Sequence, residues 1–397
     1  MDKTQREEIL KRVRPRVVWR GEPPLGAWYT EEEIEAAVRA IRDSLDWNVG
    51  FTGPEIEEFE EAFAAYVGTK YAVAINGAGT GLDMSMMCLD LEPGDEVISC
   101  ALNFPGTHLA IIGQGGKLVL CEPDPRTFNL DPEDVERRIT PRTRAILATH
   151  MNGLSVDMDA LLEIAERHPH PKHGPLKVIG DAARACGGTY KGTKIGQKGW
   201  MTVFSFHTQK LMCTLGEGGM ITTDDPQVAE RLRQLRSFGR GVSWGTNYKM
   251  TKVQAAVGLV QLRRLDEMNA QRVKRAKQRT ELLKEVPELT LPYEPPGYGH
   301  TYYLYTILVP REWAGEKRDR LMKILAEERR VGCVVANPPT YKSNRLIREH
   351  TAGQEVPRAE EIGARLFCPS LHPLMTEEEN EYAAAAIIEA VERVENE

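Results

Sequence analysis

The sequence predicts an α/β protein with a large domain, whose mostly parallel seven-stranded sheet lies between layers of helices, and a smaller C-terminal α+β domain. Short apolar runs alternate with amphipathic helical patterns between about residues 55 and 240. This alternation is typical of a parallel sheet covered on both faces, because each parallel connection needs a crossover segment. From about residue 250, a long helical pattern leads into a region of mixed helices and short strands.

Seven apolar runs have the length of buried strands. They are YAVAIN (71–76), EVISC (96–100), KLVLC (117–121), RAILATH (144–150), KVIGD (177–181), MTVFSF (201–206) and GGMITT (218–223). Amphipathic segments separate most of them, and one such segment places Ile56, Phe59, Phe63 and Tyr66 on a shared helix face. The last run follows the sixth so closely that we expect these two strands to be antiparallel.

Helix starts carry capping signals, namely the pairs Thr30 and Glu33, Thr376 and Glu379, and Asp131 with Pro132. A helical pattern over 253–279 is expected to bridge the two domains, with its basic stretch RVKRAKQR facing solvent. The predicted divisions are an N-terminal arm (1–35), a large domain (36–270) and a small C-terminal domain (271–397).

Composition narrows the class of protein. A net charge of −7 over 397 residues argues against a broad nucleic-acid surface. The seven cysteines show no C-x-x-C spacing and the nine histidines no H-E-x-x-H spacing, so we expect a reducing compartment and no metal site. No run resembles a signal peptide or a membrane span, and we expect a cytoplasmic protein.

A lysine at the end of a predicted buried strand points to chemistry. In FSFHTQKLMCTLGEGG (204–219), Ser205, His207 and Lys210 fall within six residues, and a glycine-rich turn follows. A charged amine is unfavourable to bury, so a lysine held between apolar residues and glycines suggests an amine kept for reaction. The plain alternative is a solvated surface lysine.

Other strand ends supply complementary groups. Asp181 ends KVIGD, Phe104 follows EVISC, and AINGAGTGLDM turns from strand to helix through glycines. With Lys210, these are the parts needed to hold pyridoxal phosphate: a reactive amine, a carboxylate for the pyridine nitrogen, a helix start for the phosphate and a ring that stacks. Alone, each has a plain alternative as a turn, a helix cap or a core residue, so the interpretation depends on their common placement.

The segment GDAARACGGTYKGTKIGQKGWMTVFSFHTQKLMCTLGEGGMITT closely resembles the signature region of the DegT-like sugar aminotransferases, which are pyridoxal-phosphate enzymes of fold type I. The resemblance extends along the chain and is strongest from about 50 to 270. Its other segments are FTGPEIEEFEEAFAAYVGTKYAVAINGAGTGL, LEPGDEVIS, CEPDPRTFNLDPEDVE, HMNGLSVDMDALLEIA, NYKMTKVQAAVGLVQL and CPSLHPLMTEEE.

The resemblance implies roles for the residues that match the family motifs. Lys210 is expected to form the Schiff base with the cofactor and then to act as general base and acid. Asp181 is expected to pair with the pyridine nitrogen, and Phe104 to stack on the ring. The cofactor would alternate between pyridoxal 5'-phosphate and pyridoxamine 5'-phosphate in the two half-reactions.

The same resemblance assigns the phosphate site and an assembly. Ala78 and Gly79 should offer backbone N–H groups and Ser205 its hydroxyl. Asn247 of NYKM corresponds to a residue that reaches the phosphate of a neighbouring subunit, which implies a homodimer with shared active sites.

Several positions depart from the family pattern or leave a role open. Arg184 stands where the family usually has Gln or His, and it would either serve the cofactor's phenolic oxygen or a substrate anion, or turn away into an ion pair. Asn152 replaces a usual aromatic residue. His207 and His300 are candidate substrate-pocket residues, although a structural role is the alternative for each.

The expected activity is transfer of an amino group from glutamate or glutamine to a keto sugar, nucleotide-linked or phosphorylated, or to a keto-cyclitol, in antibiotic or polysaccharide biosynthesis. A pyridoxal-phosphate keto-sugar dehydratase is a rival, but that activity accompanies histidine in place of Lys210. A non-catalytic cofactor-binding regulator is the second rival, and the intact Lys, Asp and Ser set argues against it.

Overall fold

A computed structural model describes residues 1–397, with the exception of residues 2, 14, 16 and 17. The large domain contains a seven-stranded sheet in the order β1-β9-β8-β5-β4-β2-β3. All seven predicted strands are confirmed, and β9 is the antiparallel member, paired with both β1 and β8. The strands are β1 (Tyr71–Ile75), β2 (Glu96–Cys100), β3 (Lys117–Cys121), β4 (Thr143–Thr149), β5 (Lys177–Asp181), β8 (Met201–Ser205) and β9 (Gly219–Thr223).

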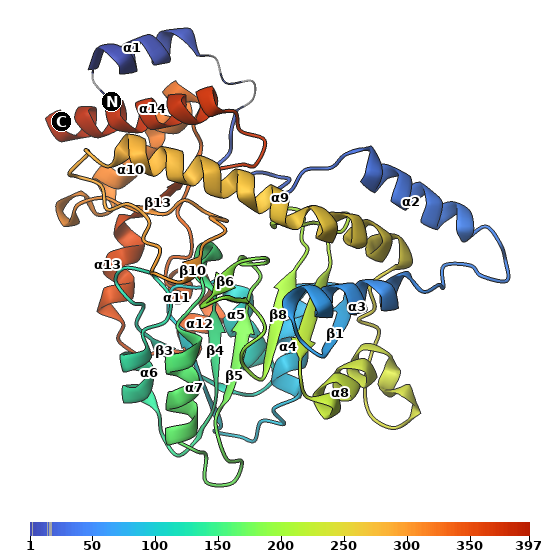
Figure 1. The fold of residues 1–397 in the computed structure, drawn as a ribbon. Coiled ribbons are helices and arrows are strands. Elements are labelled where there is room, and N and C mark those ends of the chain that lie inside the picture. Colours follow the sequence, from blue (N-terminus) through green and yellow to red (C-terminus); the bar gives the residue numbers. More distant parts are fainter. Residues whose placement is uncertain (2, 14, 16–17) are drawn as a thin grey trace.

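Helices cover both faces of this sheet (Figure 1), as expected for parallel strands joined by crossover helices. Helices α6 and α7 pack together on one face, and α4 and α5 pack together on the other. The helices of the large domain are α2 (Glu31–Asp43), α3 (Glu55–Val67), α4 (Ala78–Met87), α5 (Pro105–Gly113), α6 (Pro132–Arg138), α7 (Met158–Arg167) and α8 (Pro226–Arg236).

The predicted capping signals are confirmed. Thr30 and Thr376 each form a complete capping box, at the starts of α2 and α14 (Glu377–Asn396). The Asp131 side chain accepts a hydrogen bond from the Glu133 backbone N–H at the start of α6. Each interaction satisfies a backbone donor that the helix leaves unpaired, which explains why these helices begin where they do.

The long helix α9 (Lys252–Leu283) connects the two parts of the chain. Its Leu265 and Met268 lie in the apolar core of the large domain, whereas Ala276 and Leu283 lie in the core formed with the C-terminal region. The predicted domain boundary at 270/271 therefore falls inside one continuous helix, at the change from one core to the other.

The expectation that RVKRAKQR faces solvent is wrong for two of its arginines. Arg272 and Arg279 lie seven residues apart, so they share a helix face, and both are fully buried. Arg272 donates hydrogen bonds to the backbone carbonyls of Gly26 and Leu371, and Arg279 donates to Asn380. Hydrogen bonding to these fixed oxygens compensates for burial of the guanidinium groups.

The C-terminal region contains a small antiparallel sheet in the order β11-β13-β12 and the helix α14. Helix α1 (Lys3–Arg12), in the predicted N-terminal arm, packs beside α14 (Figure 1). The elements of this region are β11 (Ile307–Leu308), α10 (Glu316–Lys323), β12 (Cys333–Val334), α11 (Thr340–Ser343), α12 (Arg345–His350), α13 (Pro357–Arg365) and β13 (Leu366–Pro369). A further three-stranded sheet combines β6 (Thr189–Tyr190), β7 (Thr193–Lys194) and β10 (Tyr298–Gly299).

Within the described part of the chain, no helix is both long and apolar enough to cross a membrane.

Candidate active site

A cavity of about 520 Å³ lies at the carboxyl ends of the parallel strands. Thr149 at the end of β4, Asp181 at the end of β5 and Ser205 at the end of β8 all line it. Parallel strands bring their carboxyl ends to one edge of a sheet, which is the edge where the sequence predicted a ligand. Residues that are far apart in the sequence therefore meet here.

Lys210 lies in the turn that follows β8 and contributes its side chain to this cavity. Its Nζ donates a hydrogen bond of 3.2 Å to the hydroxyl of Tyr303 and lies 4.9 Å from the centre of that ring. Burial, aided by the nearby Arg184 guanidinium, lowers the pKa of Lys210 to about 8. A substantial fraction of the amine is therefore neutral near physiological pH, which is the form that acts as nucleophile and base.

Asp181 presents a buried carboxylate to the same cavity. Its oxygens accept hydrogen bonds from the Thr107 hydroxyl at 2.7 Å and from the Ala183 backbone N–H at 3.1 Å. Both donors fix the orientation of the carboxylate. No cationic side chain among the described residues forms an ion pair with Asp181, so the carboxylate is available to a cationic group of a ligand.

The start of α4 lines the same cavity as these residues. Its N-cap, Gly77, has an extended backbone and no side-chain cap. The backbone N–H groups of Ala78 and Gly79 precede the first hydrogen bond within the helix, from Gly81 N–H to the Gly77 carbonyl. Ser205 is close to this helix start within the cavity lining, and its hydroxyl oxygen accepts a bond from the His207 N–H while its own proton is free to be donated. Such a helix start binds phosphate.

Phe104 is the N-cap residue of α5 and contributes an aromatic ring to the cavity wall. Its side chain is 60% exposed, which is unusual for phenylalanine away from a binding surface. Asn103 fixes the preceding turn through two hydrogen bonds of its side chain. Its oxygen accepts from the Phe104 backbone N–H, and its amide nitrogen donates to the Thr149 hydroxyl. The ring is thus placed at the site without being buried in the core.

Arg184 lines the cavity, and no carboxylate among the described residues forms an ion pair with it. Its Nη1 donates to Asn152 Oδ1 at 3.3 Å, and its guanidinium lies 5.4 Å from the centre of the Tyr303 ring. Asn152 is itself held by a 2.9 Å hydrogen bond to Thr306. The asparagine that replaces the usual aromatic residue therefore anchors an arginine whose charge remains available.

Of the other predicted site residues, one lines the cavity and two lie outside it. His207 lines the cavity, and its Nε2 lies 3.9 Å from Glu217. His300 does not line the cavity: its buried ring stacks on Tyr302 at 3.9 Å, and burial lowers its pKa to about 3. Of the two alternatives for His300, these contacts fit the structural role. Asn247 is exposed and lies outside the cavity of its own chain.

Sequence reasoning missed several residues that line the cavity or contact the side chains that line it. Glu22 reaches it from the N-terminal arm and Asn337 from the C-terminal region. Tyr303, also from the C-terminal region, contacts the cavity residue Lys210. Thr107 and Asn103 were also missed, although both lie within three residues of Phe104, just after a predicted strand. Polar residues at that position indicate a site, because ligands bind where parallel strands end. No group of three or more His, Cys, Asp or Glu side chains suited to a metal occurs among the described residues.

The residues present fit pyridoxal phosphate. A lysine of lowered pKa, an unpaired buried carboxylate, a free helix start and an exposed ring surround one cavity, and each matches one part of that cofactor. The fold and this site define a pyridoxal-phosphate enzyme of fold type I.

Comparison with known proteins identifies the family. The sequence profile of the DegT/DnrJ/EryC1/StrS aminotransferase family matches residues 29–388, and the chain belongs to this family. It is 40% identical to GDP-perosamine synthase of Caulobacter vibrioides, over 70% of this chain and 75% of that protein. It is 35% identical to the spore coat polysaccharide biosynthesis protein SpsC of Bacillus subtilis, over 77% and 81% of the two chains.

Solved structures agree with this assignment. An aminotransferase from Psychrobacter cryohalolentis superposes with a TM-score of 0.85 at 27% identity, covering 94% of this chain and 99% of that one. DesV of S. venezuelae superposes with a TM-score of 0.82 at 34% identity, covering 92% and 96%. The chain is therefore similar over nearly its whole length to aminotransferases of known structure.

Proposed function

We propose that this aminotransferase moves an amino group from glutamate or glutamine to a keto sugar, with Lys210 and Asp181 as its catalytic residues. The observation that carries the proposal is that the Lys210 amine and the Asp181 carboxylate, which has no ion-pair partner among the described residues, share one cavity with the start of helix α4. This combination suits covalent capture of a cofactor aldehyde and stabilisation of a carbanion.

When bound, pyridoxal phosphate supplies the aldehyde and the electron sink that make the carbon next to nitrogen acidic. The chain's own residues do the rest. Asp181, oriented by Thr107, holds a proton on the ring nitrogen. Lys210 is partly neutral near pH 8. Its amine takes the proton from the substrate carbon next to nitrogen and returns a proton to the cofactor carbon on the other side of that nitrogen. Arg184 binds an oxyanion, either the phenolic oxygen of the cofactor or an anionic substrate group.

The names of the relatives favour a nucleotide-linked acceptor. One is a GDP-perosamine synthase, and another, 34% identical over 91% of this chain and 93% of its own, is the dTDP-3-amino-3,4,6-trideoxy-alpha-D-glucose transaminase of Streptomyces venezuelae. A phosphorylated keto sugar and a keto-cyclitol are the other acceptors to be tested. The presence of lysine at position 210 disfavours the dehydratase alternative.

A spectroscopic screen tests this function. The cofactor-loaded protein should lose its visible absorbance band on addition of glutamate or glutamine, and the band should return with the correct keto sugar. The two donors are compared side by side, and the acceptor panel contains nucleotide-linked, phosphorylated and cyclitol ketones. If no donor in the panel changes the spectrum, the regulator alternative replaces the enzyme.

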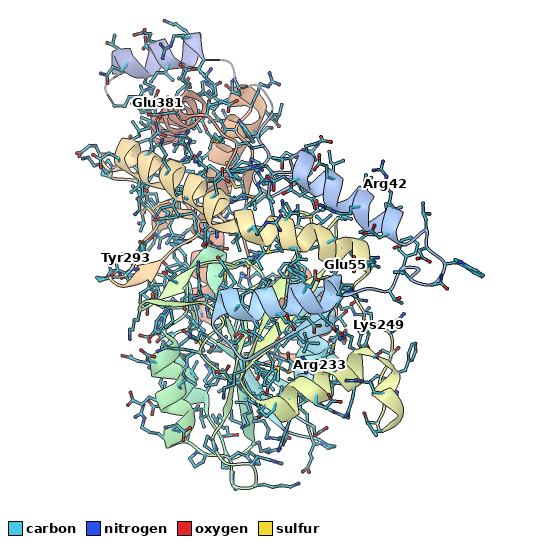
Figure 2. The ribbon with its side chains drawn as sticks, turned by 45° about the vertical axis from the view of Figure 1, so that its right-hand side comes forward. Arg42, Glu55, Arg233, Lys249, Tyr293 and Glu381 are labelled. Carbon is cyan, nitrogen blue, oxygen red and sulfur yellow. The ribbon has the colours of Figure 1, made fainter. Side chains whose placement is uncertain are left out.

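We further infer a cytoplasmic homodimer with shared active sites, formed through one edge of the molecule. Large apolar side chains are exposed along this edge, on the loop between α2 and α3 and on the loop after α8; among them Trp47 is 93%, Val242 74% and Trp244 62% exposed. Figure 2 labels Arg42, Glu55, Arg233 and Lys249 on this same side. Exposed apolar surface of this kind supports association, and Asn247 lies on the second loop.

Subunit mixing tests the shared site. Lys210→Ala and Asn247→Asp chains, each of low activity alone, are denatured together and refolded. If Asn247 serves the neighbouring subunit, half of the randomly paired dimers are mixed and each contains one intact site, so about a quarter of the wild-type rate returns. If Asn247 serves its own subunit, mixing restores nothing.

A further inference from the structure

The N-terminal arm enters the active site under restraint at both ends. On one side, the Gly332 backbone N–H donates to the Trp19 carbonyl at 2.7 Å, and the Trp19 ring stacks on His372. On the other side, the Gly26 backbone N–H donates to the Thr208 carbonyl at 2.9 Å, and the buried Arg272 guanidinium binds the Gly26 carbonyl. Glu22 lies between these anchors and is directed into the cavity.

A hydrogen-bond chain connects Glu22 to the reactive amine. The Tyr303 hydroxyl donates to Glu22 Oε1, and the same hydroxyl accepts from Lys210 Nζ at 3.2 Å. A phenol has one proton to donate, so a tyrosine whose proton is directed to a carboxylate can only accept from the lysine. The direction of both bonds is therefore fixed, and Tyr303 is buried, which leaves its ring little freedom.

We propose that Glu22 and Tyr303 are positioning residues that hold the Lys210 amine in its reactive orientation, with Glu22 also tuning its affinity for protons. This inference rests on the proposed role of Lys210. With one N–H engaged by Tyr303, the neutral amine keeps one N–H and its lone pair for a ligand in the cavity that Lys210 lines. A misplacement of about 1 Å in such a group is enough to reduce a rate about 100-fold.

Charges from several elements surround the amine, and they act in opposite directions. Burial and Arg184, which follows β5, lower the pKa of Lys210, whereas the carboxylates of Glu22, Asp181 and Glu217 raise it. His207, from the same turn as Lys210, also lines the cavity. Glu22 is the carboxylate that the N-terminal arm brings, so it counteracts Arg184 from the opposite wall.

Two substitutions separate the two parts of the proposal. Glu22→Gln keeps an oxygen that accepts from Tyr303 but removes the negative charge, so Lys210 should lose its proton at lower pH. Tyr303→Phe removes the bond that orients the amine and changes no charge. Tyr302→Phe is the matched control, because that neighbouring tyrosine stacks on His300 away from the cavity.

The first measurement uses the cofactor-free protein. A brief pulse of acetic anhydride is applied across a pH series, and acetylation of Lys210 is quantified by mass spectrometry of its peptide. In Glu22→Gln the midpoint should fall by about half a pH unit or more, which corresponds to about 0.7 kcal/mol of lost charge interaction. An unchanged midpoint overturns the tuning role, and a raised acceptor KM with an unchanged midpoint makes Glu22 a substrate ligand.

The second measurement is the steady-state rate of the loaded enzyme. Tyr303→Phe should reduce kcat about 10- to 100-fold with the donor KM within about threefold, whereas Tyr302→Phe retains the wild-type kcat. A Tyr303→Phe enzyme with wild-type kcat overturns the positioning role. A Lys210→Ala enzyme that still turns over overturns the proposed function instead, so the two failures are distinguishable.

Discussion

The two walls of the active-site cavity are built in different ways. The wall from the large domain consists of residues at the ends of neighbouring strands, such as Asp181 and Ser205, which the hydrogen-bonded sheet holds in register. The opposite wall consists of Glu22 and Asn337, which come from the N-terminal arm and the C-terminal region. Its arm segment depends on a few contacts, above all those of Arg272 and His372.

The two walls of the cavity therefore supply different kinds of functional group. Groups that the chemistry requires sit on the sheet, where a shift of one side chain would require a shift of the whole strand. Groups that tune the amine or contact the substrate come from segments held by individual hydrogen bonds, which are easier to change without loss of the fold. Substitutions on the sheet wall should therefore affect activity more than substitutions on the opposite wall.

The largest effect is expected for Asp181→Asn. An amide cannot keep the ring nitrogen of the cofactor protonated, and a hydrogen bond to a charged group contributes about 1.5–3 kcal/mol, so kcat should fall by up to about 100-fold. Thr107→Val is the companion variant, since it removes one donor to Asp181 but leaves the carboxylate, and its kcat should fall by only about 10-fold. Equal rates for Asp181→Asn and wild type would contradict this assignment.

A smaller effect is expected for Ser205→Ala. Loss of the hydroxyl from the phosphate site should weaken binding of pyridoxal phosphate about 10- to 100-fold, as measured by titration of the cofactor-free protein. Ser370→Ala is the matched control, because the buried Ser370 hydroxyl has no hydrogen-bond partner among the residues that the structure describes and lies outside the cavity. If both variants bind the cofactor equally, Ser205 is not part of the phosphate site.

A separate effect concerns the stability of the folded protein, with no change in turnover to measure. The folded protein holds Lys210 at a pKa of about 8, below its unfolded value, so burial of the charged amine destabilises the folded state at pH 7. The cofactor-free Lys210→Met variant should therefore be more stable than wild type at pH 7, by up to about 3 kcal/mol. This difference in free energy of unfolding should become smaller as pH rises from 8 to 10.5, because the lysine of the wild-type protein then becomes neutral in the unfolded chain as well.

Urea unfolding of both proteins at pH 7 and pH 10 provides this comparison. If the difference in free energy of unfolding between the two proteins is the same at both pH values, the pKa of Lys210 is not lowered in the folded chain.

The sheet wall was predictable because it follows from local patterns. Apolar runs locate the strands, and Asp181, Ser205 and Lys210 stand directly at or after strand ends. Glu22 was not predictable, because its position depends on Arg272 and His372, which are distant in sequence. The sequence analysis placed Arg272 on the solvent-facing side of its helix, because an arginine in a helical pattern is normally counted as an exposed polar residue. The backbone carbonyls that accept its hydrogen bonds come from distant segments and cannot be inferred from the pattern.

His300 shows the limit of reasoning from a family position. The family position left a substrate contact and a structural role open for this residue, and in the structure its ring packs on Tyr302 and its Nδ1 accepts the Tyr302 backbone N–H at 2.9 Å. The residue three positions later, Tyr303, is the one that reaches the amine. A single sequence cannot decide which of several adjacent polar residues points into a cavity, because that depends on the local twist of the backbone.

The most direct test of the account is the identity of the lysine that carries the cofactor. The loaded protein is treated with borohydride, digested, and its peptides are mapped by mass spectrometry. The pyridoxyl phosphate mass should appear on the peptide that contains Lys210 and on no other lysine. Attachment to a different lysine, with Lys210 unmodified, would contradict the assignment on which the proposed mechanism rests.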